Sequence, residues 1–426
     1  MTSWTRAPVT LMDPERQSLF EDTDFRAIWS AGILIGIVRW VEFLGVGIYA
    51  FDATGSAFLT ALLALLRFLP LALFGVVIGS LADLIDTSRL LRILIALGAS
   101  VSVAITALFL LDLVTFWHVA LATFISGIVW SSDLPLRRKL VGEIAGPERL
   151  GAAMAIDTAV ANNGTRLVGP LIGGAIYQWM GGTGIFLFCT LLYGLSFLMV
   201  FQIDRRGVFP AADPSSWLLR PLINAWQAFR FAASNREIMA LLSITVVFNI
   251  WGFPMLSMVP VIGKEELGIS ASSIGAIMAL EGMAAFTGSL VMARISSPPF
   301  YRMIYYYSVC GVLVIVFLMG VFPSTITLVI GLVGFGLAGA CFSIMQSTLI
   351  YLVAPVAMRG RLLGVMTICI GSGVIGFANI GVMADIFGGS NALWIVSLEG
   401  VVPMVIIGIY WRQIPGGVRK ENKGEN

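Results

Sequence analysis

The sequence predicts an all-α integral membrane protein with twelve transmembrane helices in two pseudo-symmetric six-helix halves. The first observation is composition: 58% of the 426 residues are hydrophobic and 12% are charged, whereas soluble domains carry about 25% charged residues. The second is that apolar runs of about 20 residues, the length of a spanning helix, recur along the whole chain. The third is the one-sided placement of the basic residues.

The apolar runs predict the twelve spans, and an even number places both termini on the same side of the membrane. The predicted spans are 25–51, 57–81, 90–111, 115–135, 150–178, 183–203, 238–262, 271–294, 303–322, 324–350, 361–387 and 392–411.

The basic residues indicate which side of the membrane this is. Of the 26 Lys and Arg residues, 22 lie in the two tails and the even-to-odd loops, or at the helix ends beside them. Only Lys264 lies on the opposite side, and three arginines are intramembrane. Because basic residues collect on the cytoplasmic side, we expect both termini to be cytoplasmic.

The same pattern divides the chain into five parts. We expect a cytoplasmic N-tail without a signal-peptide core (1–24), an N-terminal six-helix bundle (25–203), a cytoplasmic linker (204–236), a C-terminal six-helix bundle (237–412) and a cytoplasmic C-tail (413–426). In the linker, Leu222, Ile223, Trp226 and Phe229 share one helical face. We therefore expect an amphipathic helix that lies flat on the cytoplasmic surface.

The two halves repeat short segments six helices apart. Gly79-Ser80-Leu81 at the end of span two matches Gly288-Ser289-Leu290 at the end of span eight. The openings of spans five and eleven are also alike, at Arg149-Leu150-Gly151 and Arg361-Leu362-Leu363-Gly364. Repeats of this kind are typical of secondary transporters, which bind substrate between their halves near the bilayer midplane.

Span five carries an arginine followed closely by proline and glycines. An arginine at mid-membrane depth costs several kcal/mol unless it faces a cavity or a partner. Small residues let helix backbones touch, and proline bends the helix. We therefore expect Gly169-Pro170 and Gly173-Gly174, which follow Asn163 and Arg166, to form the bend and the close contact by which span five packs between the halves.

These residues resemble the major facilitator superfamily, and within it the drug:proton antiporter branch that includes enterobactin- and macrolide-exporter-like proteins. Gly169-Pro170-Leu171-Ile172-Gly173-Gly174 matches the G-P-x-x-G-G core of the antiporter motif in helix five. Asn163-Gly164-Thr165-Arg166 is similar to the N-x-x-R that precedes it in this branch. Thr54-Gly55-Ser56-Ala57 and Arg359-Gly360-Arg361 resemble the branch's helix one–two turn and the segment before helix eleven.

The superfamily signature of the loop between helices two and three is present in reduced form. Gly79 and Asp83 are kept, and Arg89 is what remains of the basic cluster. In the family, the aspartate stabilises one conformer through a helix N-terminus and a nearby arginine. The resemblance therefore implies that Asp83 contacts the start of span eleven together with Arg137 or Arg138.

Charged residues inside the membrane are the candidates for coupling transport to protons. A carboxylate in a low-dielectric cavity can take up and release protons as access alternates between the two sides. The candidate proton carriers are Glu42, Glu281 and Asp133, and their candidate charge partners are Arg39, Arg67 and Arg166.

Alternatives stay open for these charges. Arg39 and Glu42 lie three residues apart on one face of span one and could form a static pair that only neutralises two buried charges. Glu281 either faces a cavity or forms a salt bridge to Arg67 or Arg166 across the interface between the halves. Arg166 either serves conformational coupling or makes a simple helix–helix hydrogen bond.

A second set of residues is expected to line the substrate cavity. The candidates are Trp40, Trp130, Asn249, Trp251 and Gln346. Packing or an interfacial belt is the alternative role for the aromatic members. Polar groups are sparse at the centre of the second half, which favours a hydrophobic or amphiphilic substrate over a sugar or a peptide.

The four cysteines lie in apolar spans without C-x-x-C pairing, and the chain has one histidine, so neither a metal site nor a cofactor is indicated and an enzyme is not expected. We expect a monomeric, proton-coupled exporter of small amphiphilic molecules (drugs, siderophores or macrolides) in the bilayer of the bacterial inner membrane, with no nucleic-acid partner. The alternatives are a lipid or lysolipid transporter or an importer of the same fold, and a transport-dead sensor.

Overall fold

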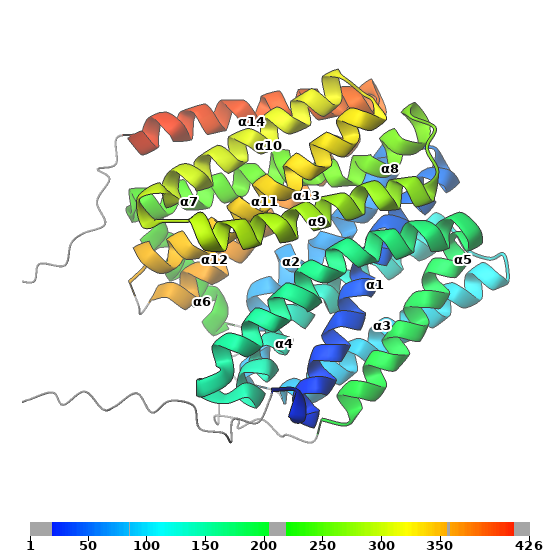
Figure 1. Cartoon of the computed structure of the whole chain (residues 1–426), viewed down its shortest axis with the longest axis horizontal. Helices are drawn as coiled ribbons and strands as arrows, with labels where there is room; N and C mark the ends of the chain where they lie inside the picture. Colours follow the sequence, from blue (N-terminus) through cyan, green and yellow to red (C-terminus); the bar gives the residue numbers. More distant parts are fainter. Residues whose placement is uncertain (1–18, 85, 204–218, 356–357, 413–426) are drawn as a thin grey trace, which may run out of the picture.

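The computed structural model describes residues 19–84, 86–203, 219–355 and 358–412, and its helices form two groups (Figure 1). The first group, the N-half, consists of α1 (Thr23–Thr54), α2 (Ala57–Leu84), α3 (Thr87–Leu110), α4 (Phe116–Ile156) and α5 (Thr165–Phe201). The second group, the C-half, contains α7 (Arg236–Val247), α8 (Val259–Val261), α9 (Ala271–Ile295), α10 (Tyr301–Val321), α11 (Thr325–Val353), α12 (Arg359–Gly371), α13 (Gly373–Phe387) and α14 (Gly389–Arg412).

Eleven helices in the described ranges are long and apolar enough to cross a membrane. One of them, Glu148–Phe201, contains two of the predicted spans. The chain turns inside it at Gly181, whose φ of 60° is a left-handed value that favours glycine. The ribbon of α5 accordingly doubles back on itself (Figure 1). With that turn, the eleven helices account for the twelve predicted spans.

The break between spans four and five is shorter than the predicted loop. Helical backbone continues past Pro135, the chain turns at Gly146, with φ 68° and ψ 171°, and helical backbone then resumes to Ile156. A proline inside a membrane helix is tolerated where neighbouring groups satisfy the freed backbone. The longer helix brings Arg137 into the bundle, although the spacing had placed this residue in a cytoplasmic loop.

Two spans of the C-half are interrupted. The seventh span continues from α7 through a π-helix (Phe248–Gly252), a 3-10 helix (Phe253–Met258), α8 and a second π-helix (Ile262–Glu266). Pro254 and Pro260 lie within it, and proline removes a helical hydrogen-bond donor. The eleventh span is divided into α12 and α13 at Ser372.

The halves are joined at the end of the bundle opposite the chain termini, which we call the distal end; the end where α1 begins and α14 finishes is the terminal end. At the distal end the ammonium of Lys264 lies 3.2 Å from the carboxylate of Asp52, and the hydroxyl of Ser56 lies 3.2 Å from Oδ1 of Asp385. The backbone N–H of Ala271 donates to the side chain of a residue in α5, Gln178, at 3.0 Å.

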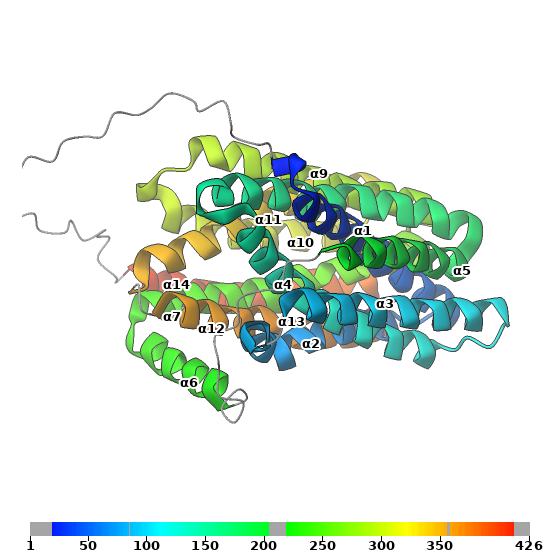
Figure 2. The ribbon, with the colours of Figure 1, turned by 90° about the horizontal axis from the view of Figure 1, so that it is seen from below.

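The linker contains the expected amphipathic helix, α6 (Leu219–Ser234). Ala228 and Ala232 are buried against the bundle, whereas Ile223, Trp226 and Phe229 are 52%, 62% and 48% exposed. Figure 2 shows α6 projecting beside α12 and α7. That its apolar face rests on the cytoplasmic membrane surface remains a prediction.

Candidate functional site

Arg67 of α2 and Glu42 of α1 form a buried ion pair inside the N-half. Nη1 of Arg67 lies 3.3 Å from Oε2 of Glu42, and the two side chains are 4% and 2% exposed. Nη2 of Arg67 also donates to the backbone carbonyl of Arg39 at 2.9 Å. The alternative of a static Arg39–Glu42 pair is therefore wrong, because Glu42 is paired with a cation from the neighbouring helix.

Arg39 belongs to a second network of four buried charges. Its Nη2 donates to Oδ2 of Asp133 in α4 at 3.2 Å, and Nε of Arg137 donates to the same oxygen at 3.4 Å. Arg137 also pairs with Asp157. The side chains of Asp133, Arg137 and Asp157 are each 1% exposed. Two arginines face two aspartates, and this neutrality offsets part of the cost of burial.

Arg137 is the centre of this network, a role that sequence reasoning missed. The signal that could have identified it is the four-residue spacing from Asp133, which places both side chains on one helical face. Gly32 of α1 makes room for it, since a Cβ there would lie 2.7 Å from Cδ of Arg137.

The reduced loop signature is only partly described. Gly79 and Asp83 fall within α2, but the side chain of Asp83 lies outside the described part of the structure, so its expected contact is not described either. Arg137, one of the two arginines expected near Asp83, contacts Asp133 and Asp157, and a contact of Asp83 with Arg137 or Arg138 stays a prediction. Arg89 forms an ion pair with Asp86, the N-cap of α3, at 3.5 Å.

A further ion pair, Arg166–Glu281, joins the two halves. Nε of Arg166 in α5 donates to Oε2 of Glu281 in α9 at 2.7 Å, and Nη2 of Arg166 pairs with Oε1 of the same carboxylate. The guanidinium also lies over the ring of Trp40, 5.1 Å from its centroid. Of the alternatives for Glu281, the structure shows the salt bridge to Arg166.

An eight-residue π-helix, η2 (Asp157–Gly164), lies between the buried network and this inter-half pair. It begins at Asp157, contains Asn163, and is followed after one residue by Arg166. Gly36 of α1 lies against it, because a Cβ there would be 2.5 Å from the carbonyl of Ala161. Wide helical turns of this type often mark functional sites.

The glycines of the antiporter-like motif serve two different surfaces. Gly169 packs on Trp40 of α1, and a Cβ on Gly173 would lie 3.1 Å from Cα of Val41 in the same helix. A Cβ on Gly174 would instead lie 2.9 Å from Cα of Gly275 in α9. The expected packing between the halves is therefore correct for Gly174 and wrong for Gly169 and Gly173.

We expect Gly174→Ala to loosen the distal contact between the halves. Its new methyl group would lie 2.6 Å from the carbonyl of Ala271, and such overpacking costs about 1–3 kcal/mol. The measurement is disulfide formation between cysteines placed at Ser56 and Asp385, which should slow by roughly 5- to 150-fold. Gly164→Ala is the control, because its nearest neighbouring atom would be 3.5 Å away. An unchanged rate in Gly174→Ala would contradict the assignment.

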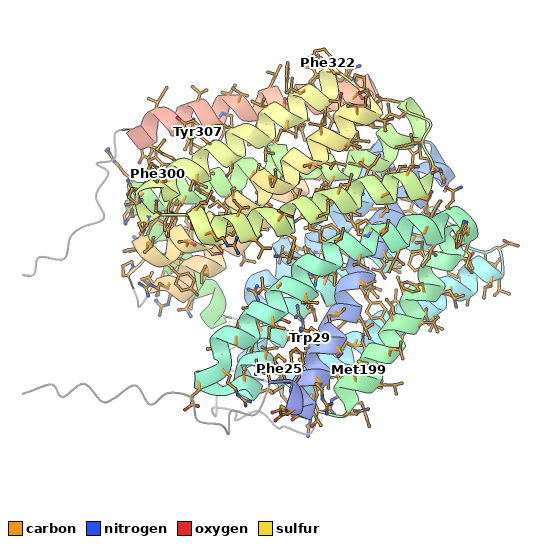
Figure 3. All side chains as sticks on the ribbon, in the orientation of Figure 1. Phe25, Trp29, Met199, Phe300, Tyr307 and Phe322 are labelled. Carbon is orange, nitrogen blue, oxygen red and sulfur yellow. The ribbon has the colours of Figure 1, made fainter. Side chains whose placement is uncertain are left out.

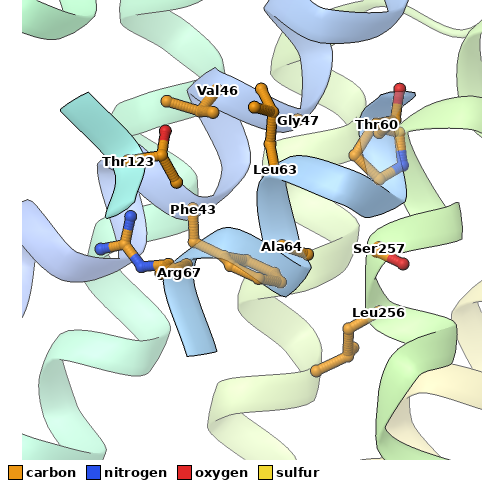
Figure 4. A pocket seen from close by; sticks show the side chains of 11 residues that line it. Phe43, Val46, Gly47, Thr60, Leu63, Ala64, Arg67, Thr123, Leu256 and Ser257 are labelled. Carbon is orange, nitrogen blue, oxygen red and sulfur yellow. The ribbon is translucent and has the colours of Figure 1, made fainter. Parts of the chain in front are cut away.

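A narrow pocket lies between α1, α2, α4 and the seventh span (Figure 4). Arg67 lines it together with the hydroxyls of Thr60, Thr123 and Ser257. Apolar side chains, including that of Phe43, complete its wall. Its volume of about 20 Å³ is room for about one water molecule. Arg67, the cationic member of the Glu42–Arg67 pair, therefore lines a pocket to which both halves contribute residues.

Aromatic rings close the centre of the bundle next to this pocket. Phe68 contacts Trp130 of the N-half at a centroid distance of 4.7 Å, and Phe253 and Phe377 of the C-half at 5.3 and 5.2 Å. Trp130, a predicted cavity residue, also lies beneath the guanidinium of Arg39. Sequence reasoning missed Phe68 and Phe377, because nothing distinguishes them from other apolar residues of their spans.

Three of the other predicted cavity residues bond within the C-half. Nδ2 of Asn249 donates to the carbonyl of Thr245 at 2.8 Å, and Nε2 of Gln346 donates to the hydroxyl of the same threonine at 3.3 Å. Nε1 of Trp251 donates to the carboxylate of Glu399 at 3.1 Å. None of the three lines the pocket of Figure 4.

The fold and the site are those of a multi-pass membrane protein, in which apolar helices surround buried ion pairs and the Arg166–Glu281 pair joins the two halves. The family model described as Major Facilitator Superfamily matches residues 28–378. The chain belongs to the Major Facilitator Superfamily, and it is therefore a membrane transporter and not an enzyme.

Individual relatives are distant. The Staphyloferrin A transporter of Staphylococcus aureus (strain NCTC 8325 / PS 47) is 20% identical over 402 residues, which cover 93% of this chain and 98% of the relative. A POT family transporter in complex with a thioalcohol-conjugated peptide aligns with a TM-score of 0.75 at 12% identity, over 92% of this chain and 96% of that one. A D-xylose–proton symporter aligns with a TM-score of 0.73 at 13% identity, over 94% and 99%. The two structures show the fold alone.

Proposed function

We propose that this protein is a proton-coupled exporter of small hydrophobic or amphiphilic molecules, of the drug:proton antiporter branch. The observation that carries the proposal is the buried Glu42–Arg67 pair, whose arginine lines a pocket between the halves. Glu281 and Asp133 are the other candidate carriers, but each is bonded to an arginine outside that pocket.

The pair suits coupling because its attraction depends on the charge of Glu42. When Glu42 is ionised it holds the Arg67 guanidinium; when it takes up a proton, that attraction is lost and Arg67 is free to contact a substrate. One proton moving down the membrane potential supplies about 2.3 kcal/mol per 100 mV. This is enough to concentrate a neutral solute by somewhat under two decades.

Other observations support export of this substrate class. The G-P-x-x-G-G motif resembles that of antiporters, and a distant relative is named for a siderophore, staphyloferrin A. The aromatic cluster around Phe68 favours apolar or amphiphilic substrates. The excess of basic residues at the terminal end favours a cytoplasmic location for both termini and the linker helix, with the two bundles in the bacterial inner membrane. We infer that the protein works as a monomer.

The test uses everted membrane vesicles and a panel of amphiphilic dyes, macrolides and siderophores. We expect one class to cause proton release with the wild type and none with Glu42→Gln, because the amide cannot carry a proton. Glu143→Gln, an exposed acid of α4, is the matched control and should behave as the wild type. Persistent release in Glu42→Gln would exclude Glu42 as the carrier. If the wild type moves lysolipid but none of the panel, a lipid transporter of the same fold would be favoured.

A further inference from the structure

A groove runs between α10 and α14 on the outer face of the C-half. Its volume is about 600 Å³, and its lining residues are Arg302, Met303, Tyr306, Tyr307, Cys310, Val405, Gly408, Ile409 and Trp411. Met303, Tyr307, Val405 and Ile409 are each more than half exposed. In a membrane-spanning bundle, side chains exposed in this way contact lipid.

The groove is polar at one end and apolar at the other. Arg302 is the second residue of α10 and Trp411 the last but one of α14, so both lie at the terminal end. Figure 3 shows the same direction, with Phe300 and Tyr307 toward the terminal end of α10 and Phe322 at the distal end. Cys310 lies eight residues after Arg302, or about 12 Å deeper along a helix. This gradient matches a phospholipid, which has a charged head and an acyl chain.

A glycine keeps the groove open. The hydroxyl of Tyr306 donates to the carbonyl of Met404 at 2.9 Å, so the ring is held against α14. A Cβ on Gly408 would collide with that hydroxyl. Because Gly408 has no side chain, the ring of Tyr306 can lie against α14, where it forms one wall of the groove.

Among the side chains that the structure describes at the polar end, Arg302, Arg236 and Glu237 together carry one net positive charge. Arg302 forms an ion pair with Glu237 of α7, and Arg236 lies over the ring of Tyr410, 5.8 Å from its centroid. A guanidinium has five N–H donors, so the pair with Glu237 does not exhaust those of Arg302. Nε1 of Trp411 is buried, and no acceptor for it is found among the residues that the structure describes.

We propose that this groove binds one anionic phospholipid from the leaflet at the terminal end. The phosphate lies between Arg302 and the indole N–H of Trp411, and one acyl chain follows Met303 and Ile409 toward Cys310. Basic pockets between helices on the cytoplasmic side are suited to anionic head groups. The proposal does not depend on the substrate or the direction of transport.

The test compares retention of phosphatidylglycerol and phosphatidylcholine by the purified full-length protein, using native mass spectrometry. The wild type should retain one phosphatidylglycerol in preference to phosphatidylcholine. Arg302→Gln should weaken this retention by about fivefold, and Glu237→Gln should strengthen it by a similar factor, because one charge near a membrane surface changes affinity by about that much. If the Arg302–Glu237 pair served only to stabilise the fold, the two variants would change lipid retention in the same direction or not at all.

A second pair of variants tests the acyl chain. Ile409→Trp fills the groove and should remove the bound lipid, whereas Ile326→Trp, on an exposed position at the distal end of α11, should not. Equal retention of the two lipids by the wild type would overturn the proposal, as would retention that none of the groove variants changes. If phosphatidylglycerol binds only after deletion of residues 413–426, the groove is occupied by the chain's own tail, and the proposal is also overturned.

Discussion

Asp157→Leu should lower the free energy of unfolding by about 3–5 kcal/mol, the cost of leaving one charge of a buried pair without its partner. The substitution leaves Arg39 and Arg137 to share Asp133, whose side chain is 1% exposed. Two buried cations then face one buried anion. The measurement is thermal unfolding of the detergent-solubilised protein.

A double variant should restore the stability that Asp157→Leu loses. Arg137→Met combined with Asp157→Leu removes both members of one pair and leaves Arg39 with Asp133 in a one-to-one pair. Replacing a whole buried pair by apolar residues is often neutral, so the double variant should regain most of the lost stability. Glu143→Leu, at an exposed position of α4, should change stability by less than about 0.5 kcal/mol. A double variant as unstable as Asp157→Leu would show that the network is needed for reasons other than charge balance.

Glu281→Gln should reduce transport by roughly 10- to 100-fold, because it removes the negative charge that neutralises the guanidinium of Arg166 at the contact between the halves. Removing one charge of a buried pair costs about 3–5 kcal/mol, and the amide oxygen of the glutamine keeps part of that contact. The glutamine is nearly isosteric, so packing against α5 is preserved. A pair that served only packing would therefore leave Glu281→Gln close to the wild type.

A double-mutant cycle separates this pair from other buried acids. Arg166→Gln and Glu281→Gln should be strongly non-additive in transport rate, since either change alone breaks the same contact. Glu399→Gln is the matched control, because Glu399 bonds Trp251 and Asn379 within the C-half. Its effect should add to that of Arg166→Gln. Additivity for both acids would remove Arg166–Glu281 as a specific link between the halves.

Much of the fold could be read from the sequence, because a spanning helix must be long and apolar. The location of the buried charges could be read for the same reason, since Arg39, Arg67, Arg166 and Glu281 interrupt apolar runs. Their pairing could not. Arg39 and Glu42 share a helix face, yet they pair with α4 and α2, and that choice depends on how the helices are rotated in the bundle.

The sequence predicted that close helix contacts occur, but not which helices form them. The glycines of span five indicate close helix contacts, but Gly173 and Gly174 are neighbours in the chain and pack on different halves. π-Helical turns have no characteristic amino-acid composition. The sequence therefore did not predict η2 or the interruptions of the seventh span. Arg137 was misplaced because a cluster of basic residues beside a proline is typical of a cytoplasmic loop.

The pairing of Arg39 with Asp133 also has a consequence for biosynthesis, because the two residues are 94 positions apart in the chain. At a translation rate of about 5–20 residues per second, roughly 5 to 20 seconds pass between the synthesis of Arg39 and that of Asp133. An arginine at the centre of a newly inserted helix costs about 2.5–3.5 kcal/mol on insertion scales. The first helix of this protein must therefore be held by the insertion machinery, or by its early neighbour α2, until the fourth helix is made.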